Sequence, residues 1–363
     1  EMYEKRIRVR YRVDGDLREM APLPFKYRAA IVSRIKIMAD LDISERRLPQ
    51  DGRIKIKISG RTVDLRVSVL PTIFGEKVVM RILDPLALMV DMTMLGFREE
   101  DLTKFDEKIH LPFGIILVTG PTGSGKTTTL YSALKQINKV DLNILTAEDP
   151  VEFNFDGINQ VAVKSEIGMT FAAALRSFLR QDPDIIMVGE IRDSETAEIA
   201  IRAALTGHLV FSTLHTNDAP SSINRLIDMG VPNYLVASST KLIMAQRMMR
   251  KICQQCKEEV NLSSEQVKSL CVPKELLSNI RAFKGVGCAE CNQSGMTGRT
   301  GIYEVMPITN EIESLILTRA TDADIRKVAL KEGMFSLRMC AVEKMKQGFV
   351  SIDEVFAVTS APQ

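Results

Sequence analysis

The sequence contains no tryptophan, only three histidines and no long hydrophobic run. A membrane-spanning helix needs about 18 consecutive apolar residues, whereas the longest apolar runs here, such as Ile115–Val118 and Ile185–Val188, have the length of buried strands. No signal peptide is recognisable, and the chain begins at Glu1 within a strand-like pattern. We therefore expect a cytoplasmic protein, and a chain that lacks an upstream region.

An excess of charge of one sign is also missing. The formal net charge is +2, which gives no overall attraction to nucleic acid or to anionic lipid. Hydrophobic residues make up 45% and charged residues 26% of the chain, as is ordinary for soluble globular proteins. With 363 residues, the chain is long enough for two or more domains with separate cores.

Residues 1–84 show the alternation of apolar and polar side chains that is typical of strands. The alternating segments are residues 7–13, 54–58 and 63–69. Asp14-Gly15 and Ser59-Gly60 provide hairpin turns between strands, and Tyr27–Ala39 has apolar residues at helical spacing. These patterns predict a small α+β domain at the N-terminus.

After an expected linker at 85–96, the pattern changes to short apolar strands that alternate with helices. The predicted strands are Ile115–Val118, Ile144–Thr146, Ile185–Val188 and Leu209–Ser212. Such near-continuous apolar runs indicate an α/β domain, at 97–363, with a mainly parallel sheet covered on both faces. This domain includes a cysteine-containing insert at 251–295 and a helical C-terminal region at 307–363. Ser351 and Glu354 have the spacing of a capping box at the last helix.

A glycine-rich motif follows the strand Ile115–Val118. Its residues are Gly120, Pro121, Thr122, Gly123, Ser124, Gly125, Lys126 and Thr127, which fit GxxxxGK[ST]. A helical pattern, Thr128–Val140, follows at once, so backbone N–H groups and the helix N-terminus are expected to surround a phosphate. Lys126 is expected to reach the β- and γ-phosphates and Thr127 to ligate Mg²⁺. A glycine-rich turn without a ligand is the alternative.

Acidic residues follow two of the predicted strands. Glu148 comes after Ile144–Thr146, and Glu190 comes after Ile185–Val188. Carboxylates at the carboxyl ends of parallel strands are placed to hold the water shell of a metal or to orient an attacking water. Gly189 stands where an aspartate usually ends the metal-binding strand. In the alternative interpretation, such acidic residues merely cap the next helix.

Among the scarce histidines, His208 and His215 flank the strand Leu209–Leu214. A lone histidine is more often structural, but His215 is our candidate for sensing the γ-phosphate. Arg66 and Arg81 lie on strand-like segments of the N-terminal domain. An arginine from another subunit can neutralise transition-state charge, although a solvated surface strand explains these two residues as well.

Four of the six cysteines form two CxxC pairs, whereas Cys271 and Cys340 stand alone and are expected to be packed thiols. The pairs are Cys253 with Cys256 and Cys288 with Cys291. Four thiolates suit a closed, structural, tetrahedral Zn²⁺ site, and the long span between the pairs is expected to carry its own small fold, with a helix after Ser263. A redox CxxC is the alternative, but nothing thioredoxin-like surrounds either pair.

Several segments, taken in order, resemble the secretion and type IV pilus ATPases of the type II/type IV secretion superfamily. GPTGSGKT at 120–127, ILTAEDPVEF at 144–153, GEIRD at 189–193 and TGHLVFSTLHTND at 206–218 resemble its Walker A, Asp-box, atypical Walker B and His-box. RVRYRVDGDL at 8–17 and GRTGIYEV at 298–305 extend the resemblance over nearly the whole chain. A glycine at 189 is normal in this family.

The resemblance implies a RecA-like domain preceded by a small PAS-like domain, assembled as a homohexamer with ATP and Mg²⁺ between the two kinds of domain. It implies catalysis by Glu148 and Glu190 and phosphate sensing by His215. The implied nucleotide-binding residues are Gly120, Pro121, Thr122, Gly123, Ser124, Gly125, Lys126, Thr127, Thr128, Arg66, Arg81, Arg225 and Arg299.

The tetracysteine insert makes the chain similar to the assembly-type members, which power pilus extension or type II secretion, and unlike the retraction ATPases. We expect pilus extension, with type II secretion as the alternative. The implied partner is an inner-membrane platform protein, to which the cytoplasmic ATPase binds peripherally. A DNA-translocating ring would need basic or aromatic pore elements, and no such cluster is present. A nucleotide-gated scaffold without turnover is the non-enzymatic alternative.

Overall fold

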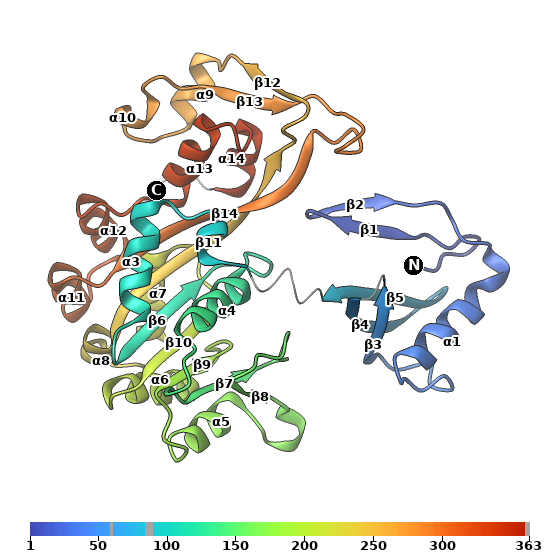
Figure 1. Ribbon diagram of the computed structural model, residues 1–363, viewed down its shortest axis with the longest axis horizontal. Coiled ribbons are helices and arrows are strands. Elements are labelled where there is room, and N and C mark those ends of the chain that lie inside the picture. Colours follow the sequence, from blue (N-terminus) through green and yellow to red (C-terminus); the bar gives the residue numbers. More distant parts are fainter. Residues whose placement is uncertain (59–60, 84–89, 360–363) are drawn as a thin grey trace. The chain divides into compact units, whose positions relative to one another are not determined.

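The computed structural model describes residues 1–58, 61–83 and 90–359, and within these the side chain of Arg61 is left aside. The chain forms two compact units, Glu1–Leu88 and Met89–Gln363. Each unit is described by itself (Figure 1).

Within its described residues, the first unit combines one α-helix with two antiparallel sheets. Its elements are β1 (Arg10–Val13), β2 (Asp16–Glu19), η1 (Phe25–Tyr27), α1 (Arg28–Met38), β3 (Gln50–Ile58), β4 (Arg61–Thr72) and β5 (Gly75–Leu83). The β1–β2 hairpin turns at Asp14 and Gly15, with φ of 50° and 99°, as their sequence predicts. The other predicted turn, Ser59-Gly60, lies outside the described residues. In the β3–β4–β5 sheet, Ile54, Val67 and Val69 face a buried core.

The second unit is built on a seven-stranded sheet in the order β14-β11-β6-β10-β9-β7-β8. Its strands are β6 (Gly114–Thr119), β7 (Ile144–Glu148), β8 (Asn159–Ala162), β9 (Ile185–Val188), β10 (Leu209–Leu214), β11 (Thr240–Ile252) and β14 (Met296–Pro307). Only β14 pairs antiparallel, at the edge beside β11. The predicted mainly parallel sheet is confirmed, and all four predicted strands are present.

Helices cover both faces of this sheet (Figure 1). They are α3 (Glu99–Ile109), α4 (Lys126–Ile137), α5 (Phe171–Phe178), α6 (Ser194–Leu205), α7 (Ala219–Asp228) and α8 (Asn233–Ser239), with η2 (Met92–Met94) and η3 (Ser165–Ile167) as short additions. α5 to α8 bury apolar side chains in one continuous core with alternate residues of the strands, such as Ile115 and Leu117 of β6. α3 and α4 lie on the other face, toward which Ile116 and Val118 point.

The insert and the C-terminal region follow β11. The insert contains β12 (Lys257–Val260), α9 (Ser264–Ser269), α10 (Lys274–Leu277) and β13 (Ala282–Gly285). Ser263 and Gln266 form a complete capping box at α9. The C-terminal helices are α11 (Asn310–Leu317), α12 (Asp322–Lys331), α13 (Leu337–Lys346) and α14 (Ile352–Val358).

The predicted capping box at α14 is half formed. The Ser351 side chain accepts a hydrogen bond from Glu354 N, but the Glu354 carboxylate does not return it. Instead it accepts hydrogen bonds from the backbone and guanidinium of Arg250 on β11, at 2.8 to 3.0 Å. A buried charge pair is the stronger interaction for this carboxylate, so the tertiary contact replaces the local one.

Of the predicted linker at 85–96, only the part from Val90 onward lies within the described residues. That part is held on the second unit, because Ser132 Oγ donates to Val90 O at 2.6 Å and both Gly301 N and Tyr303 OH donate to Leu95 O. Among the described residues, no helix has the length and apolar character that crossing a membrane requires.

Candidate nucleotide site

The glycine-rich loop connects β6 to α4 at the carboxyl edge of the sheet. Gly120, Gly123 and Gly125 have φ of 150°, 80° and 90°, a backbone region that favours glycine. A Cβ on Gly120 would lie 2.5 Å from Gln246 O, and one on Gly125 would lie 2.8 Å from Gln246 Nε2. The motif therefore needs glycine both for its turns and for the close approach of β11.

Lys126 closes the loop over its own backbone. Its Nζ donates to Gly120 O at 2.6 Å and to Pro121 O at 3.2 Å. Burial lowers the pKa of Lys126, and the nearby Glu190 carboxylate opposes that shift. The ammonium is thus held by two neutral carbonyls in a partly desolvated position.

The start of α4 supplies further donors. The first N–H groups of a helix have no partner within the helix. Because α4 begins at Lys126, Lys126 and Thr127 belong both to the glycine-rich motif and to the first turn of this helix. The hydroxyl of Ser124 is buried and has no hydrogen-bond partner among the described residues, while Thr127 is exposed. This donor set, with one ammonium and several N–H groups, fits a phosphate chain.

Glu190 and His215 meet at the ends of the neighbouring strands β9 and β10. His215 Nε2 lies 3.3 Å from Glu190 Oε2. Arg192 donates to the same carboxylate and lies 3.6 Å from Asp149 Oδ2. Burial works to raise the pKa of Glu190, but Arg192 and His215 together hold that pKa below its ordinary value. Glu190 is therefore a carboxylate at neutral pH.

Gly189 occupies a crowded place in β9's continuation. A Cβ there would lie 3.2 Å from Ala147 O and 3.5 Å from Glu148 Cα. A side chain at residue 189 would be packed tightly against the backbone of β7, whereas glycine fits there without displacing that strand.

Glu148, the other predicted catalytic carboxylate, lies in a buried cluster. It accepts hydrogen bonds from Thr146 Oγ1 at 2.6 Å, from Gln160 Nε2 at 3.0 Å and from Tyr131 OH. Burial raises the pKa of Tyr131, and the Glu148 carboxylate beside it acts in the same direction. In this conformation both oxygens of Glu148 accept hydrogen bonds from protein donors.

In the first unit, three arginines stand directly opposite one another across the sheet. Arg53 on β3 pairs with Arg66 on β4, which pairs with Arg81 on β5. Among the described residues, none of the three forms an ion pair. Like charges at directly opposed positions destabilise a sheet, so this row is a face suited to an anion.

The two other predicted arginines lie elsewhere in the second unit. Arg225 is exposed on α7. Arg299 is exposed on β14, opposite Arg250 of β11.

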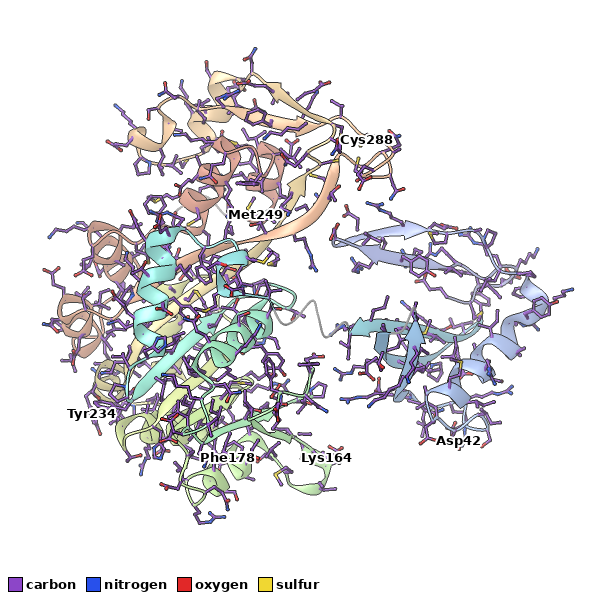
Figure 2. All side chains as sticks on the ribbon, viewed as in Figure 1. Asp42, Lys164, Phe178, Tyr234, Met249 and Cys288 are labelled. Carbon is purple, nitrogen blue, oxygen red and sulfur yellow. The ribbon has the colours of Figure 1, made fainter. Side chains whose placement is uncertain are left out.

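The four cysteines of the CxxC pairs come together at the base of the insert. All four sulfur atoms lie within 4.8 Å of one another, and three of the separations are 3.7 to 3.9 Å. A tetrahedral ion with sulfur ligands at about 2.3 Å requires separations of about 3.8 Å. Cys288 N and Gly295 N donate to Cys291 Sγ at 3.2 Å, as suits a thiolate. Cys288, labelled in Figure 2, lies in the loop between β13 and β14.

The remaining cysteines lie apart from this cluster. Cys340 is buried and donates to Tyr303 O at 2.9 Å, which agrees with a packed thiol, whereas Cys271 is exposed. The prediction that Cys271 is packed is therefore wrong, because Cys271 follows the end of α9 in a loop.

A glycine-rich loop at the carboxyl edge of a parallel sheet, with acidic and histidine side chains at the neighbouring strand ends, defines the P-loop class of α/β proteins. Residues 1–357 match the model of the family "Type II/IV secretion system protein". The chain belongs to this family, which confirms the resemblance seen in the sequence.

Relatives within the family include proteins of two machines. The chain is 56% identical over 362 residues to the type IV pilus assembly ATPase PilB of Myxococcus xanthus, covering 99% of this chain and 64% of that protein. It is 47% identical over 359 residues to the type II secretion system ATPase E of Vibrio cholerae, covering 99% of this chain and 71% of that protein. The chain thus spans just under two thirds of the length of the first of these relatives.

Solved structures share the fold. The pilus retraction motor PilT with bound ADP superimposes with a TM-score of 0.65 at 26% identity, covering 97% of this chain and 90% of that one. The ATPase DotB of Yersinia pseudotuberculosis gives a TM-score of 0.70 at 23% identity, covering 95% and 85%, which shows the fold alone.

Sequence reasoning missed three arginines, which are Arg192 beside Glu190, Arg53 opposite Arg66 and Arg247 beside the P-loop. Arg192 lies next to Glu190 within GEIRD, so its place was readable from the motif. Arg53 comes directly before the alternating segment 54–58, and pairing that segment with 63–69 would have placed Arg53 opposite Arg66. Arg247 carries no local signal, because only the pairing of β11 with β6 brings it to the P-loop.

Proposed function

We propose that this chain is the ATP-hydrolysing motor of a type IV pilus assembly machine. The observation that carries the proposal is the P-loop with Glu190 and His215 at the neighbouring strand ends, 3.3 Å apart. The 56% identity to a pilus assembly ATPase supports the choice of machine. Type II secretion is the second candidate, supported by 47% identity to a secretion ATPase.

In the proposed reaction, Gly120–Thr128 surround the phosphates and Lys126 exchanges its carbonyl partners for phosphate oxygens. Mg²⁺, held through Thr127, would neutralise phosphate charge. Glu190 orients a water that attacks the γ-phosphorus and accepts its proton, while the bond to ADP breaks. His215 contacts the γ-phosphate, and through its own contact with Glu190 it couples the binding of that phosphate to the position of the Glu190 carboxylate.

We also propose a catalytic role for Glu148, which requires that this carboxylate first lose one of its present hydrogen bonds. Its oxygens are occupied by Thr146, Tyr131 and Gln160, so it must exchange a donor before it can reach a water. In the described conformation Glu148 is better suited to fixing α4, and with it the P-loop, onto β7 through Tyr131.

We further propose a homohexamer in which the small N-terminal domain of one copy, a PAS-like domain, completes the site on the next. Arg66 and Arg81 would then contact the nucleotide in trans, and Arg53 joins them because it stands in the same row. Arg225 and Arg299 are proposed as further nucleotide contacts. The arginine face would be neutralised by phosphate, which bidentate guanidinium groups bind well.

The tetracysteine cluster is proposed to hold one structural Zn²⁺, since four sulfur atoms with tetrahedral spacing leave no open position. The motor is proposed to act in the cytoplasm, bound to an inner-membrane platform protein, without nucleic acid. The boundaries 1–84 and 97–363 are proposed for its two domains, joined by 85–96.

The experiment that tests the machine is Glu190→Gln in the native cell. We expect surface pili to disappear while protein export stays normal. Loss of export with normal pili would favour type II secretion, and retention of both would contradict both candidates. Wild-type chain expressed in place of the variant is the control.

A further inference from the structure

β11 runs past the end of β6 and lies along the P-loop. Ala245 pairs with Thr119, so the next two residues of β11, Gln246 and Arg247, stand beside the loop. Thr129 Oγ1 donates to Gln246 Oε1 at 2.9 Å, and this bond ties the first turns of α4 to β11. Arg247, the next residue, brings a guanidinium cation to the P-loop.

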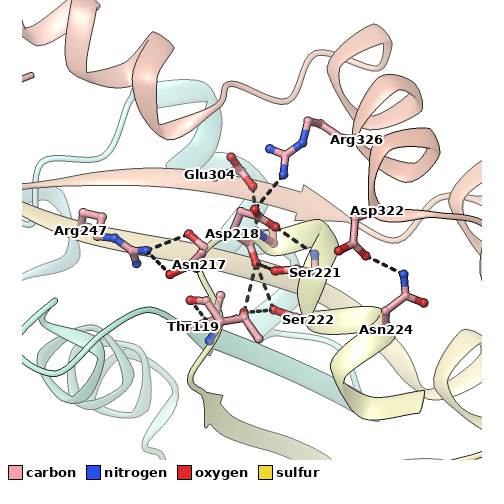
Figure 3. Close-up of polar contacts among 12 residues, drawn as sticks. Thr119, Asn217, Asp218, Ser221, Ser222, Asn224, Arg247, Glu304, Asp322 and Arg326 are labelled. Atoms are coloured by element: carbon pink, nitrogen blue, oxygen red, sulfur yellow. Dashed lines mark hydrogen bonds and ion pairs between the residues drawn. The ribbon is translucent and has the colours of Figure 1, made fainter. Parts of the chain in front are cut away.

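The guanidinium of Arg247 is held by backbone carbonyls. Nη2 donates to Asn217 O at 2.9 Å and approaches Asn217 Oδ1 at 3.4 Å, while Nη1 donates to Gln246 O at 3.2 Å. Figure 3 shows Arg247 beside Asn217. Nη1 lies 3.2 Å from the position that a Cβ on Gly120 would take. Arg247 thus joins the P-loop to the segment that carries His215.

Arg247 and Lys126 place two cations beside Gly120. The hydrogen-bond acceptors of both cations are neutral oxygens. Lys126 Nζ contacts only Gly120 O and Pro121 O, and among the described residues neither cation forms an ion pair. Burial lowers the pKa of both groups. Two half-buried cations of like sign repel each other and lose hydration, and a bound anion relieves both costs.

Resting on the proposed function, we infer that Arg247 is a nucleotide-binding residue that contacts the polyphosphate from within the same chain. Its guanidinium has more N–H donors than its present bonds use, and its planar shape suits phosphate oxygens. Because it also holds Asn217 O, it couples the occupied P-loop to the segment of His215.

The test measures equilibrium binding of fluorescent ADP to the full chain at two salt concentrations. Arg247→Gln is expected to weaken binding by about tenfold to a hundredfold, as for the loss of a charged hydrogen bond, and to reduce the salt dependence. Arg247→Lys is expected to lose about threefold to tenfold, because charge remains without the planar fork. Arg202→Gln, which removes an exposed arginine paired with Glu198 on α6, is the matched control.

Unchanged binding by a folded Arg247→Gln chain would overturn the inference, even if turnover fell, because that result assigns Arg247 a structural role. If Arg247→Gln lowers the melting temperature, Arg247→Lys decides, and wild-type affinity in that variant likewise overturns the inference. Lys126→Ala separates the two proposals. Binding lost in Lys126→Ala but not at Arg247 rejects only this inference, whereas binding retained in both rejects the P-loop as the nucleotide site.

Discussion

His215 Nε2 lies 3.3 Å from Glu190 Oε2, across the ends of two adjacent parallel strands. Because β10 also pairs with β6, the same strand connects this pair to the P-loop. Thr216, the next residue, donates its N–H to Thr119 Oγ1 at 2.9 Å at the end of β6. This hydrogen bond ties the end of β6 to the backbone next to His215.

The segment that carries His215 is also bound to the C-terminal helices. Asp218 caps α7 through Ser221 N at 2.9 Å and forms an ion pair with Arg326 of α12 at 2.7 Å (Figure 3). Arg326→Gln should leave ADP affinity within about twofold but lower turnover, since a half-buried ion pair that positions this segment is lost. Steady-state ATPase kinetics check this, with Arg202→Gln as the control. An equal loss of turnover in both variants would argue against the coupling.

Glu304 gives the unit a pH-dependent stability. It is fully buried, accepts a hydrogen bond from Ala219 N at 2.8 Å and lies near Asp218. Burial raises the pKa of Glu304 from 4.5 to about 7, so the folded chain holds an extra proton between these values. The resulting stabilisation is complete below pH 4.5 and is lost as pH rises through 7.

Glu304→Gln should therefore reduce the loss of unfolding free energy between pH 5 and pH 8 by about 1–3 kcal/mol. The amide keeps the size and the acceptor oxygen of the neutral side chain. Denaturant unfolding of wild type and variant at several pH values measures this difference. Parallel pH profiles for the two chains would show that Glu304 does not titrate in this range.

The tetracysteine cluster should bind one zinc ion per chain. Cys291→Ser should release the metal and destabilise the insert, since it removes both a ligand and the acceptor of two N–H groups. Elemental analysis and thermal unfolding report the two effects. Cys271→Ser, which alters an exposed thiol outside the cluster, should retain full metal content. Metal-free wild-type chain with normal stability would contradict the assignment.

The arginine row predicts complementation between copies. Arg66→Gln chains lack a trans arginine but keep a complete P-loop, and Lys126→Ala chains have the opposite defect. If Arg66 acts on the neighbouring copy, mixtures should regain part of the turnover that each variant lacks alone, because some sites receive an intact half from each. Phosphate release across mixing ratios measures this. Activity that stays at the sum of the separate variants would place Arg66 outside the site.

The same mixing experiment extends to Arg53. Arg53→Gln should behave as Arg66→Gln does, since the two face each other in register. Lys57→Gln, on the same exposed face of β3 but away from the row, is the matched control and should keep wild-type turnover.

Much of the second unit could be predicted from sequence because its signals are local. Apolar runs located the four strands, and the spacing of Gly120 to Thr127 located the loop. Glu190 and His215 were found because parallel strands bring their carboxyl ends to one edge. Gly189 also had a local signal, but its reason, the close approach of Ala147 O, is tertiary.

The contacts that could not be predicted from the sequence depend on the order of the strands in the sheet and on which of several hydrogen-bond partners a side chain takes. The contact of Arg247 with the loop requires β11 to lie beside β6. Glu354 fits a capping box by spacing, yet Arg250 takes its carboxylate. Glu148 looks like a catalytic residue after a strand, whereas Tyr131, 17 residues earlier in α4, holds it in a buried cluster.

The central claim is that Glu190 activates water for a nucleotide held on the P-loop. The most direct measurement is ATP affinity together with phosphate release for wild type and Glu190→Gln in the assembled protein. The account predicts ATP binding within a few-fold of wild type and turnover lower by at least about a hundredfold. Turnover near the wild-type rate in Glu190→Gln, or equal and negligible rates in both chains, would contradict it.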